Sequence, residues 1–262
     1  MKYGFIGCGN MGGAIARALS NSTKDITLAD ISGINKTLAE ELGISHADNA
    51  FVAANCDRIF LAVKPHLMKG ALAPLQEALA AHKPLLITMA AGLEIRQIEA
   101  FAGCTLPVIR IMPNTPAQIG EGVILYDANE RVKEADLAEF LAALAPAGML
   151  DRLPEKLIDA GSALAGSGPA YVSMFMEALA DGAVTCGLPR DKALQYAAQT
   201  LIGTAQLMLQ TGKHPGQMKD AVCSPGGSTI VGVRELEKGG MRAAVMEAVI
   251  ATYRKNLEFI KK

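Results

Sequence analysis

A run of glycines near the start of the chain is the segment whose residue types point most directly to chemistry. Residues 7–12 read Gly-Cys-Gly-Asn-Met-Gly and fit the pattern G-x-G-x-x-G. In this pattern the glycines allow a tight turn and close backbone approach, and the following helix offers free N–H groups to a pyrophosphate. The run follows a strand-like segment, residues 2–6, and opens a helical one, residues 11–20, which favours a dinucleotide site. The alternative is an ordinary strand–turn–helix without a ligand.

A carboxylate at the end of the second strand-like segment bears on which dinucleotide binds. Asp30 can accept the ribose 2′-hydroxyl of NAD and would repel a 2′-phosphate. Ser32 and Lys36 follow closely and could hold a phosphate, and Asp30 could equally cap the next helix. The residues leave the choice between NAD and NADP open.

Two proline-containing segments follow further strands. Residues 62–65 read Ala-Val-Lys-Pro, and residues 112–116 read Met-Pro-Asn-Thr-Pro. Ligands of open α/β sheets bind beyond the carboxyl ends of the strands, so both segments are expected to line the cofactor path. Read otherwise, they are rigid loops.

A second candidate pocket lies at residues 223–229, Cys-Ser-Pro-Gly-Gly-Ser-Thr, between two predicted helices. We expect Pro225 to end the first helix and Ser228 to begin the second. Exposed N–H groups at a helix start, with hydroxyls beside them, suit a small carboxylate. Taken alone, a Pro-Gly-Gly turn with a Ser or Thr cap explains the segment equally well.

Composition excludes several other classes. The net charge is −1, from 25 basic and 26 acidic side chains, so no basic surplus points to nucleic acid. The four histidines have no partners at zinc spacing, so no metal site is expected. No segment has the roughly 20 apolar residues that cross a bilayer. The five scattered cysteines argue against a disulfide framework and for a cytoplasmic protein.

The elements that must position these residues change in type along the chain. Residues 2–6, 26–30, 58–63, 84–89, 108–112 and 123–126 are short apolar runs typical of strands, and helical patterns lie between most of them, including 35–42, 67–80 and 133–144. This alternation predicts a mostly parallel sheet covered by helices on both faces. We therefore predict a doubly wound dinucleotide-binding domain over residues 1–155.

Residues 156–262 show no convincing strand. Long helical patterns cover residues 170–185, 191–210, 229–237 and 241–259. An apolar stripe with Met174, Phe175 and Leu179 is best explained as core or subunit interface. So small an all-helical domain, rich in alanine and glycine, is expected to pack against a second copy.

In the order of its motifs the whole chain resembles the pyrroline-5-carboxylate reductase family. The resemblance is carried by residues 5–12, 62–65, 112–116, 166–171 and 214–216, by Lys219-Asp220, and by residues 223–229 and 242–245. It implies a Rossmann domain, a helical domain that builds a homodimer, and in many members a decamer of five dimers. It further implies NADPH as the usual hydride donor, NADH in some members, and reduction of 1-pyrroline-5-carboxylate to L-proline.

The resemblance, together with the position of these motifs, gives a set of expected site residues. The cofactor residues are Ile6, Gly7, Cys8, Gly9, Asn10, Met11, Ser32, Asn49, Ala62, Val63, Lys64, Pro65, Met112, Pro113 and Asn114. The substrate residues are Ser224, Gly226, Gly227, Ser228 and Thr229. Thr229 matches the threonine that contacts the ring nitrogen, and Asp30 departs from the more neutral residues expected at its position.

We hypothesise that residues 224–229 hold the substrate carboxylate on backbone N–H groups while Thr229 orients and polarises the ring nitrogen. Two alternatives remain at this point. A β-hydroxyacid dehydrogenase needs a catalytic lysine, for which Lys156 offers no persuasive setting. A non-catalytic nucleotide sensor would have no need of residues 224–229.

Overall fold

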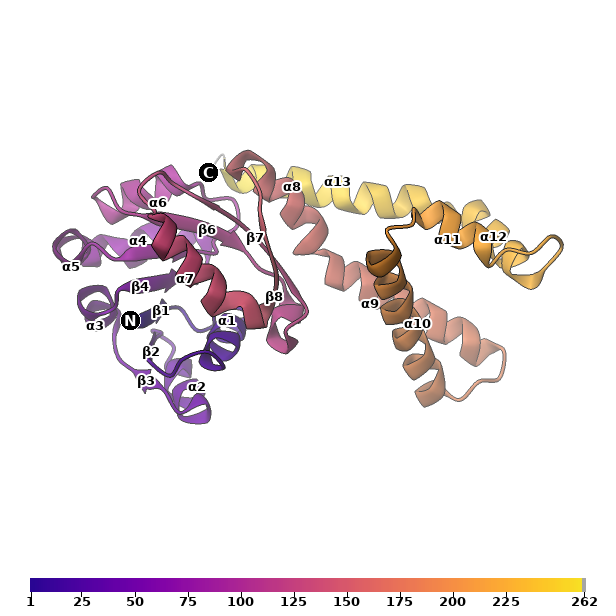
Figure 1. Cartoon of the computed structure of the whole chain (residues 1–262), viewed down its shortest axis with the longest axis horizontal. Helices are drawn as coiled ribbons and strands as arrows, with labels where there is room; N and C mark the ends of the chain where they lie inside the picture. Colours follow the sequence, from indigo (N-terminus) through magenta and orange to yellow (C-terminus); the bar gives the residue numbers. More distant parts are fainter. Residues whose placement is uncertain (261–262) are drawn as a thin grey trace. The chain divides into compact units, whose positions relative to one another are not determined.

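The computed structural model describes residues 1–260, in which strands and helices alternate up to Arg152 and only helices follow (Figure 1). The strands are β1 (Tyr3–Ile6), β2 (Ile26–Ala29), β3 (Ser45–His46), β4 (Arg58–Leu61), β5 (Leu85–Thr88), β6 (Val108–Met112), β7 (Gly122–Ala128) and β8 (Gly148–Arg152). The helices of the same region are α1 (Asn10–Ser20), α2 (Ile34–Leu42), α3 (Asn49–Asn55), η1 (Pro65–Leu67), α4 (Met68–Leu72), η2 (Ala73–Leu75), α5 (Gln76–His82), α6 (Ile95–Ala102), η3 (Thr115–Ile119), α7 (Glu134–Leu144) and η4 (Ala145–Ala147).

All eight strands form one sheet in the order β3-β2-β1-β4-β5-β6-β7-β8. Neighbouring strands run parallel except for β6 and β7, which are antiparallel. The sequence of six strands from β3 to β6 is the order of a dinucleotide-binding sheet, and it puts the carboxyl ends of β1, β2 and β4 side by side. The predicted doubly wound sheet is confirmed.

Two apolar layers hold the helices to the two faces of this sheet. On one face α1, α2 and α7 contribute residues such as Ile15, Leu38 and Phe140 to a core with Phe5 and Ile87. On the other face α3 to α6 pack against β-strand residues that include Ile59, Leu61 and Leu86. Alternate side chains of each strand therefore point into different layers, as a sheet buried on both faces requires.

The sequence prediction differs from the structure where elements are short or interrupted. The predicted helix 67–80 is divided by η2, because Pro74 lacks the N–H that a continuous helix would use. The strands β3 and β8 and the helices α3 and α6 were not predicted. The short helices η1, η3 and η4 were not predicted either. The other strands and the helices α1, α2 and α7 lie where the patterns placed them, with ends that agree to within two residues.

After β8 the chain is helical, in α8 (Glu155–Ala165), α9 (Gly168–Thr185), α10 (Arg190–Thr211), α11 (Pro215–Ala221), α12 (Ser228–Lys238) and α13 (Met241–Ile260). By its contacts the chain divides into one unit of residues 1–167 with 251–262 and a second unit of residues 168–250. Helix α8, which follows the predicted boundary at residue 155, packs within the first unit: Ile158 lies against Met112 and Leu125 of the sheet. The division into residues 1–155 and 156–262 stays a prediction.

Residues 168–250, all of which the structure describes, contain very few buried apolar side chains. Those that are buried are Ala180, Ala193 and Ala197. Larger ones are exposed instead, among them Met174 at 70% and Leu209 at 76%. A helical unit without large buried side chains cannot gain its stability from its own core, which is the condition expected of a domain that packs against another copy.

Candidate active site

The three glycines of the predicted dinucleotide motif occupy three different environments at the end of β1. Gly7 has a φ of +98°, and a Cβ there would lie 2.8 Å from the backbone of Ala62. A Cβ at Gly12 would lie 2.4 Å from the carbonyl oxygen of Gly7. A Cβ at Gly9 would meet no atom of the chain within 4 Å. Gly7 and Gly12 are thus required by the fold, whereas Gly9 keeps space open above the backbone.

Gly9 is also the N-cap residue directly before α1, and no side chain caps this helix start. The first N–H groups of a helix have no partner inside the helix, so the uncapped start of α1 presents donors and a partial positive charge. An anionic pyrophosphate that approaches over Gly9 would meet both. The geometry of residues 7–12 therefore fits a dinucleotide.

A cavity of about 420 Å³ lies at the carboxyl ends of β1, β2 and β4. It brings together four of the predicted cofactor residues, Ile6, Gly7, Asn49 and Val63, with Asp30. A second cavity of about 650 Å³ shares Asp30 and Asn49 and extends to Lys36 and His46. Sequence reasoning missed the segment from His66 to Pro74 that lines the first cavity, although it directly follows the predicted segment 62–65.

Other predicted cofactor residues line separate parts of the same region. Cys8, Gly9 and Asn10 line a cavity of about 280 Å³ that Gln118 of η3 also reaches. Lys64 and Pro65 line a cavity of about 540 Å³ beside Leu93. Ser32 is exposed, and Met11 and Ala62 are half-buried next to the glycine run.

The Asp30 carboxylate joins the glycine run to the loop after β2. Its Oδ2 accepts the N–H of Cys8 at 2.7 Å, and its Oδ1 accepts the N–H and the hydroxyl of Ser32 at 2.8 and 2.5 Å. Burial alone would raise the pKa of Asp30, but the hydrogen bonds from Ser32 and Cys8 outweigh it and lower the pKa below its usual value. Asp30 does not cap α2, which begins after Gly33 without a side-chain cap.

The Cys8 thiol is unreactive, although it lies within the glycine motif. Its Sγ lies 3.6 Å from the carbonyl oxygen of Ala29, and its side chain is buried. Burial, and then the negative charge of Asp30, raise the pKa of Cys8 to about 12. At neutral pH the group is a thiol rather than a reactive thiolate.

Met112, Pro113 and Asn114, which were also predicted to contact the cofactor, are buried: Met112 ends β6, and Pro113 and Asn114 follow it. Met112 packs against Leu125 and Ile158. The side-chain oxygen of Asn114 accepts the N–H of Val123 at 2.9 Å, and its amide nitrogen donates to the carbonyl oxygen of Ala165 at 3.0 Å. The side chains of Met112 and Asn114 therefore serve the structure around β7 and α8.

The second predicted pocket is a tight turn followed by a helix start. The N–H of Gly227 donates to the carbonyl oxygen of Ser224 at 3.0 Å, and Gly226 has a φ of +66°. With proline second and glycine third, this is the residue pattern of a type II turn. Helix α11 ends at Ala221, before Pro225, so the turn rather than the proline separates the helices.

Helix α12 begins at Ser228, as predicted, and no side chain caps it. Because Gly227 uses its N–H in the turn, the donors left for a ligand are those of Ser228, Thr229 and Ile230 in the first helical turn. Ser228 and Thr229 are exposed. In the preceding helix α11, Lys219 forms an ion pair with Asp220, and the hydrogen bond to Asp220, and then its charge, raise the pKa of Lys219.

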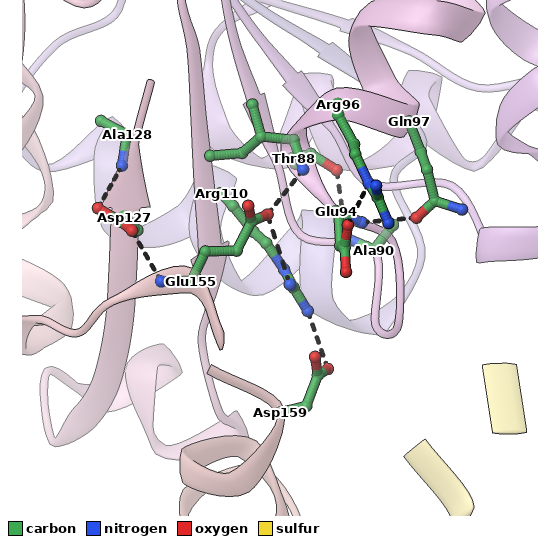
Figure 2. A network of polar contacts seen from close by, with 11 residues as sticks. Thr88, Ala90, Glu94, Arg96, Gln97, Arg110, Asp127, Ala128, Glu155 and Asp159 are labelled. Carbon is green, nitrogen blue, oxygen red and sulfur yellow. Dashed lines mark hydrogen bonds and ion pairs between the residues drawn. The ribbon is translucent and has the colours of Figure 1, made fainter. Parts of the chain in front are cut away.

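Sequence reasoning missed a buried ionic network between β6 and α8 (Figure 2). Arg110 is fully buried, and its Nη2 donates to Oδ1 of Asp159 at 2.8 Å, while its Nη1 lies 3.5 Å from Oε1 of Glu155. The same Glu155 oxygen accepts the N–H of Ile95 at 2.7 Å. A single arginine within the apolar run of β6, and carboxylates four residues apart on α8, were the available signals.

Two kinds of feature are absent from the described residues 1–260. No group of three or more His, Cys, Asp or Glu side chains is arranged to hold a metal ion. None of the helices in this range has the length and apolar character needed to span a membrane.

The comparisons with known proteins agree with this geometry. A family model for pyrroline-5-carboxylate reductase dimerisation matches residues 155–259, and one for NADP oxidoreductase, coenzyme F420-dependent, matches residues 2–92. The pyrroline-5-carboxylate reductase of Arabidopsis thaliana is 40% identical over 263 residues, which cover 98% of this chain and 95% of that protein.

Solved structures match over nearly the whole chain as well. The 1-pyrroline-5-carboxylate reductase of Streptococcus pyogenes is 35% identical with a TM-score of 0.92, covering 98% of both chains. The Plasmodium falciparum pyrroline carboxylate reductase with NADP bound is 32% identical with a TM-score of 0.91, covering 99% of this chain and 98% of that chain. Because relatives this similar span both chains almost completely, the chain belongs to the pyrroline-5-carboxylate reductase family of oxidoreductases.

Proposed function

We propose that this chain reduces 1-pyrroline-5-carboxylate to L-proline with NADPH, the last step of proline biosynthesis. The reaction makes it an oxidoreductase that acts on a CH–NH group. The observation that carries the proposal is the presence of two uncapped helix starts in a member of this family, one after the glycine run and one after the Pro-Gly-Gly turn. The first suits a pyrophosphate and the second a small carboxylate.

The cofactor is NADP, held by the glycine run and the strand ends beside it. The open space at Gly9, between the tightly packed Gly7 and Gly12, is what a backbone in contact with a pyrophosphate needs. Asn49 and Val63 line the cavity at the strand ends, where the adenosine would lie. Ala62, Lys64 and Pro65 continue the same edge of the sheet. When bound, NADPH supplies the hydride.

The substrate carboxylate is bound at the start of α12. Three N–H groups, those of Ser228, Thr229 and Ile230, have no partner within the helix and are available as donors. The positive end of the helix dipole favours an anion there. The turn formed by Ser224, Gly226 and Gly227 fixes where this helix begins, so these residues position the donors.

Thr229 hydrogen-bonds the ring nitrogen of the substrate. Its hydroxyl can donate or accept a hydrogen bond but is a poor acid, so we assign it orientation and polarisation rather than proton transfer. The proton comes from solvent, or the imine binds already protonated. The β-hydroxyacid dehydrogenase and nucleotide-sensor alternatives are set aside by membership of the reductase family.

Assembly and location follow the same proposal. Residues 168–250 expose large apolar side chains, which supports a homodimer through the helical domain, and we extend this to five dimers in a decamer. The free cysteines fit the reducing cytoplasm.

The proposal is tested by the decrease in reduced-nicotinamide absorbance when 1-pyrroline-5-carboxylate is added with NADPH, and by detection of proline. We expect the Thr229→Ala variant to lower kcat/KM by about 1–3 kcal/mol of transition-state stabilisation, the range of a lost hydrogen bond. Thr229→Ser keeps the hydroxyl and should retain most of the activity.

Two results would contradict the proposal at different levels. An unchanged kcat/KM in Thr229→Ala would remove the role of Thr229. A folded protein that binds NADPH but forms no proline would overturn the reductase function, and 3-hydroxy acids would then be tried as substrates.

A further inference from the structure

Asp30 lies where the two strand-end cavities meet. It lines both the cavity of about 420 Å³ beside Gly7 and the cavity of about 650 Å³ beside Lys36. It directly follows β2, the strand whose carboxyl end faces the adenosine ribose in dinucleotide-binding sheets. A group at this position therefore faces the ribose 2′-substituent, which is the only difference between NADH and NADPH.

The carboxylate is held in place and is negatively charged. Three donors, the Cys8 N–H and the Ser32 N–H and hydroxyl, fix both of its oxygens. These bonds lower its pKa, so the group is ionised at neutral pH. No arginine or lysine forms an ion pair with it within residues 1–260, so its charge is not neutralised by a neighbouring side chain.

We propose that Asp30 is a specificity-determining residue that shifts the cofactor selectivity of this chain towards NADH. A carboxylate has about four acceptor positions, of which the protein uses three, so one remains for the ribose 2′-hydroxyl of NADH. The 2′-phosphate of NADPH offers a charge of about −1.5 to −2 and is repelled. Lys36 and His46 line the larger cavity with Asp30 and can bind a phosphate, so NADPH is still accepted. Asp30 changes the ratio of the affinities for NADH and NADPH.

The inference rests on the proposed function only in taking the ligand to be a nicotinamide dinucleotide. It can be tested by binding alone, with two fragments that differ by the phosphate in question, adenosine 5′-monophosphate and adenosine 2′,5′-bisphosphate. Titration calorimetry on the full-length protein gives a dissociation constant for each. Turnover of 1-pyrroline-5-carboxylate plays no part in this measurement, so failure of the reductase assignment would not obscure it.

The variant is Asp30→Asn, which keeps an oxygen acceptor for Cys8 and removes the charge. We expect its preference for the bisphosphate over the monophosphate to rise about 5- to 30-fold relative to the unmodified protein, the size expected for one like-charge contact in partly aqueous surroundings. The rise should shrink at about 1 M salt, where charges are screened over about 3 Å. Asp30→Ser is a second neutral variant should Asp30→Asn fail to fold.

Asp48→Asn is the matched control. Asp48 is a second carboxylate lining the larger cavity, and its Oδ1 accepts the N–H of Phe51 at 2.7 Å, a cap that asparagine can keep. The proposal is supported if the preference for the bisphosphate over the monophosphate is unchanged in this control and rises in Asp30→Asn. An equal rise in both variants would assign the effect to the overall charge of the cavity and overturn it. So would an unchanged ratio in Asp30→Asn, or failure of the unmodified protein to bind either fragment.

Discussion

At the scale of single residues, the glycine run shows that a motif can be fixed by several independent constraints. Gly7 needs its positive φ, Gly12 has the backbone of Gly7 against it, and only Gly9 faces open space. All three positions hold glycine, but the free-energy cost of adding a side chain differs at each.

We predict that Gly9→Ala and Gly12→Ala separate ligand binding from stability. The added methyl at Gly12 would overlap the Gly7 carbonyl, so we expect a loss of about 1–3 kcal/mol in the free energy of unfolding. The methyl at Gly9 meets nothing in the chain, so stability should change by less than about 0.5 kcal/mol while NADPH binds about tenfold more weakly or worse. Thermal unfolding and NADPH titration measure the two effects.

This prediction is contradicted if Gly9→Ala binds NADPH as the unmodified protein does. The space above Gly9 would then not be where the pyrophosphate lies. Equal stability of the two variants would show that the contact at Gly12 relaxes without cost.

Some residue roles could not be predicted, because they depend on which backbone groups are already occupied. The sequence pointed to residues 224–229 as a source of N–H donors, but the N–H of Gly227 is used within the turn. Asn114 was expected to face the cofactor, and both ends of its amide are used within the protein. Asp30 was identified, but its bond from the N–H of Cys8 arises from the meeting of two loops 22 residues apart.

At the scale of elements, α8 is held to the sheet by buried charges as well as by apolar contacts. Arg110 is completely buried, and the Asp159 side chain is 8% exposed. The Arg110 atoms Nε and Nη1 have no hydrogen-bond partner among the described residues. The positive charge of Arg110 is therefore compensated by the carboxylates of Asp159 and Glu155. Removing one partner of such a pair leaves a charge in the interior that water cannot reach.

We therefore predict that Asp159→Ala lowers the free energy of unfolding by about 3–5 kcal/mol. The matched control is Asp181→Ala, which breaks an ion pair with Arg190 whose side chains are 50% and 58% exposed. That change should cost less than about 1 kcal/mol, since exposed pairs contribute little. Urea unfolding of both variants measures the difference, and similar losses would show that Glu155 alone compensates Arg110.

The elements that were predicted are those whose pattern is long enough to be read locally. The six predicted strands are apolar runs, and α1, α2 and α7 have extended helical patterns. Strand β3 is two exposed residues and is defined only by its pairing with β2. Helix α3 begins at an Asp48 cap that the pattern did not single out, and it is seven residues long. Such short elements depend on tertiary contacts rather than on their own sequence.

At the scale of the whole molecule, the two units differ in how their apolar residues are used. The sheet unit buries large side chains on both faces. Residues 168–250 have their large apolar side chains on the surface. Among these, Leu201, Leu207, Met208, Met218 and Val222 line a cavity of about 810 Å³. Composition and the family resemblance predicted that residues 156–262 form an all-helical domain for association. A helical period alone does not show which apolar side chains of such a domain stay exposed.

We predict that a charge placed in this cavity weakens self-association without unfolding the sheet unit. Leu207 is 52% exposed and lines the cavity, so Leu207→Glu removes apolar area and puts a carboxylate where a second copy would bury it. A buried leucine contributes about 1.5–3 kcal/mol, so the dissociation constant should rise by about 10- to 100-fold or more. Gln206→Glu adds the same charge one residue away on α10 and should change the dissociation constant far less. Sedimentation over a range of concentrations measures both, and unaltered assembly in Leu207→Glu would place the interface on another face of the helical unit.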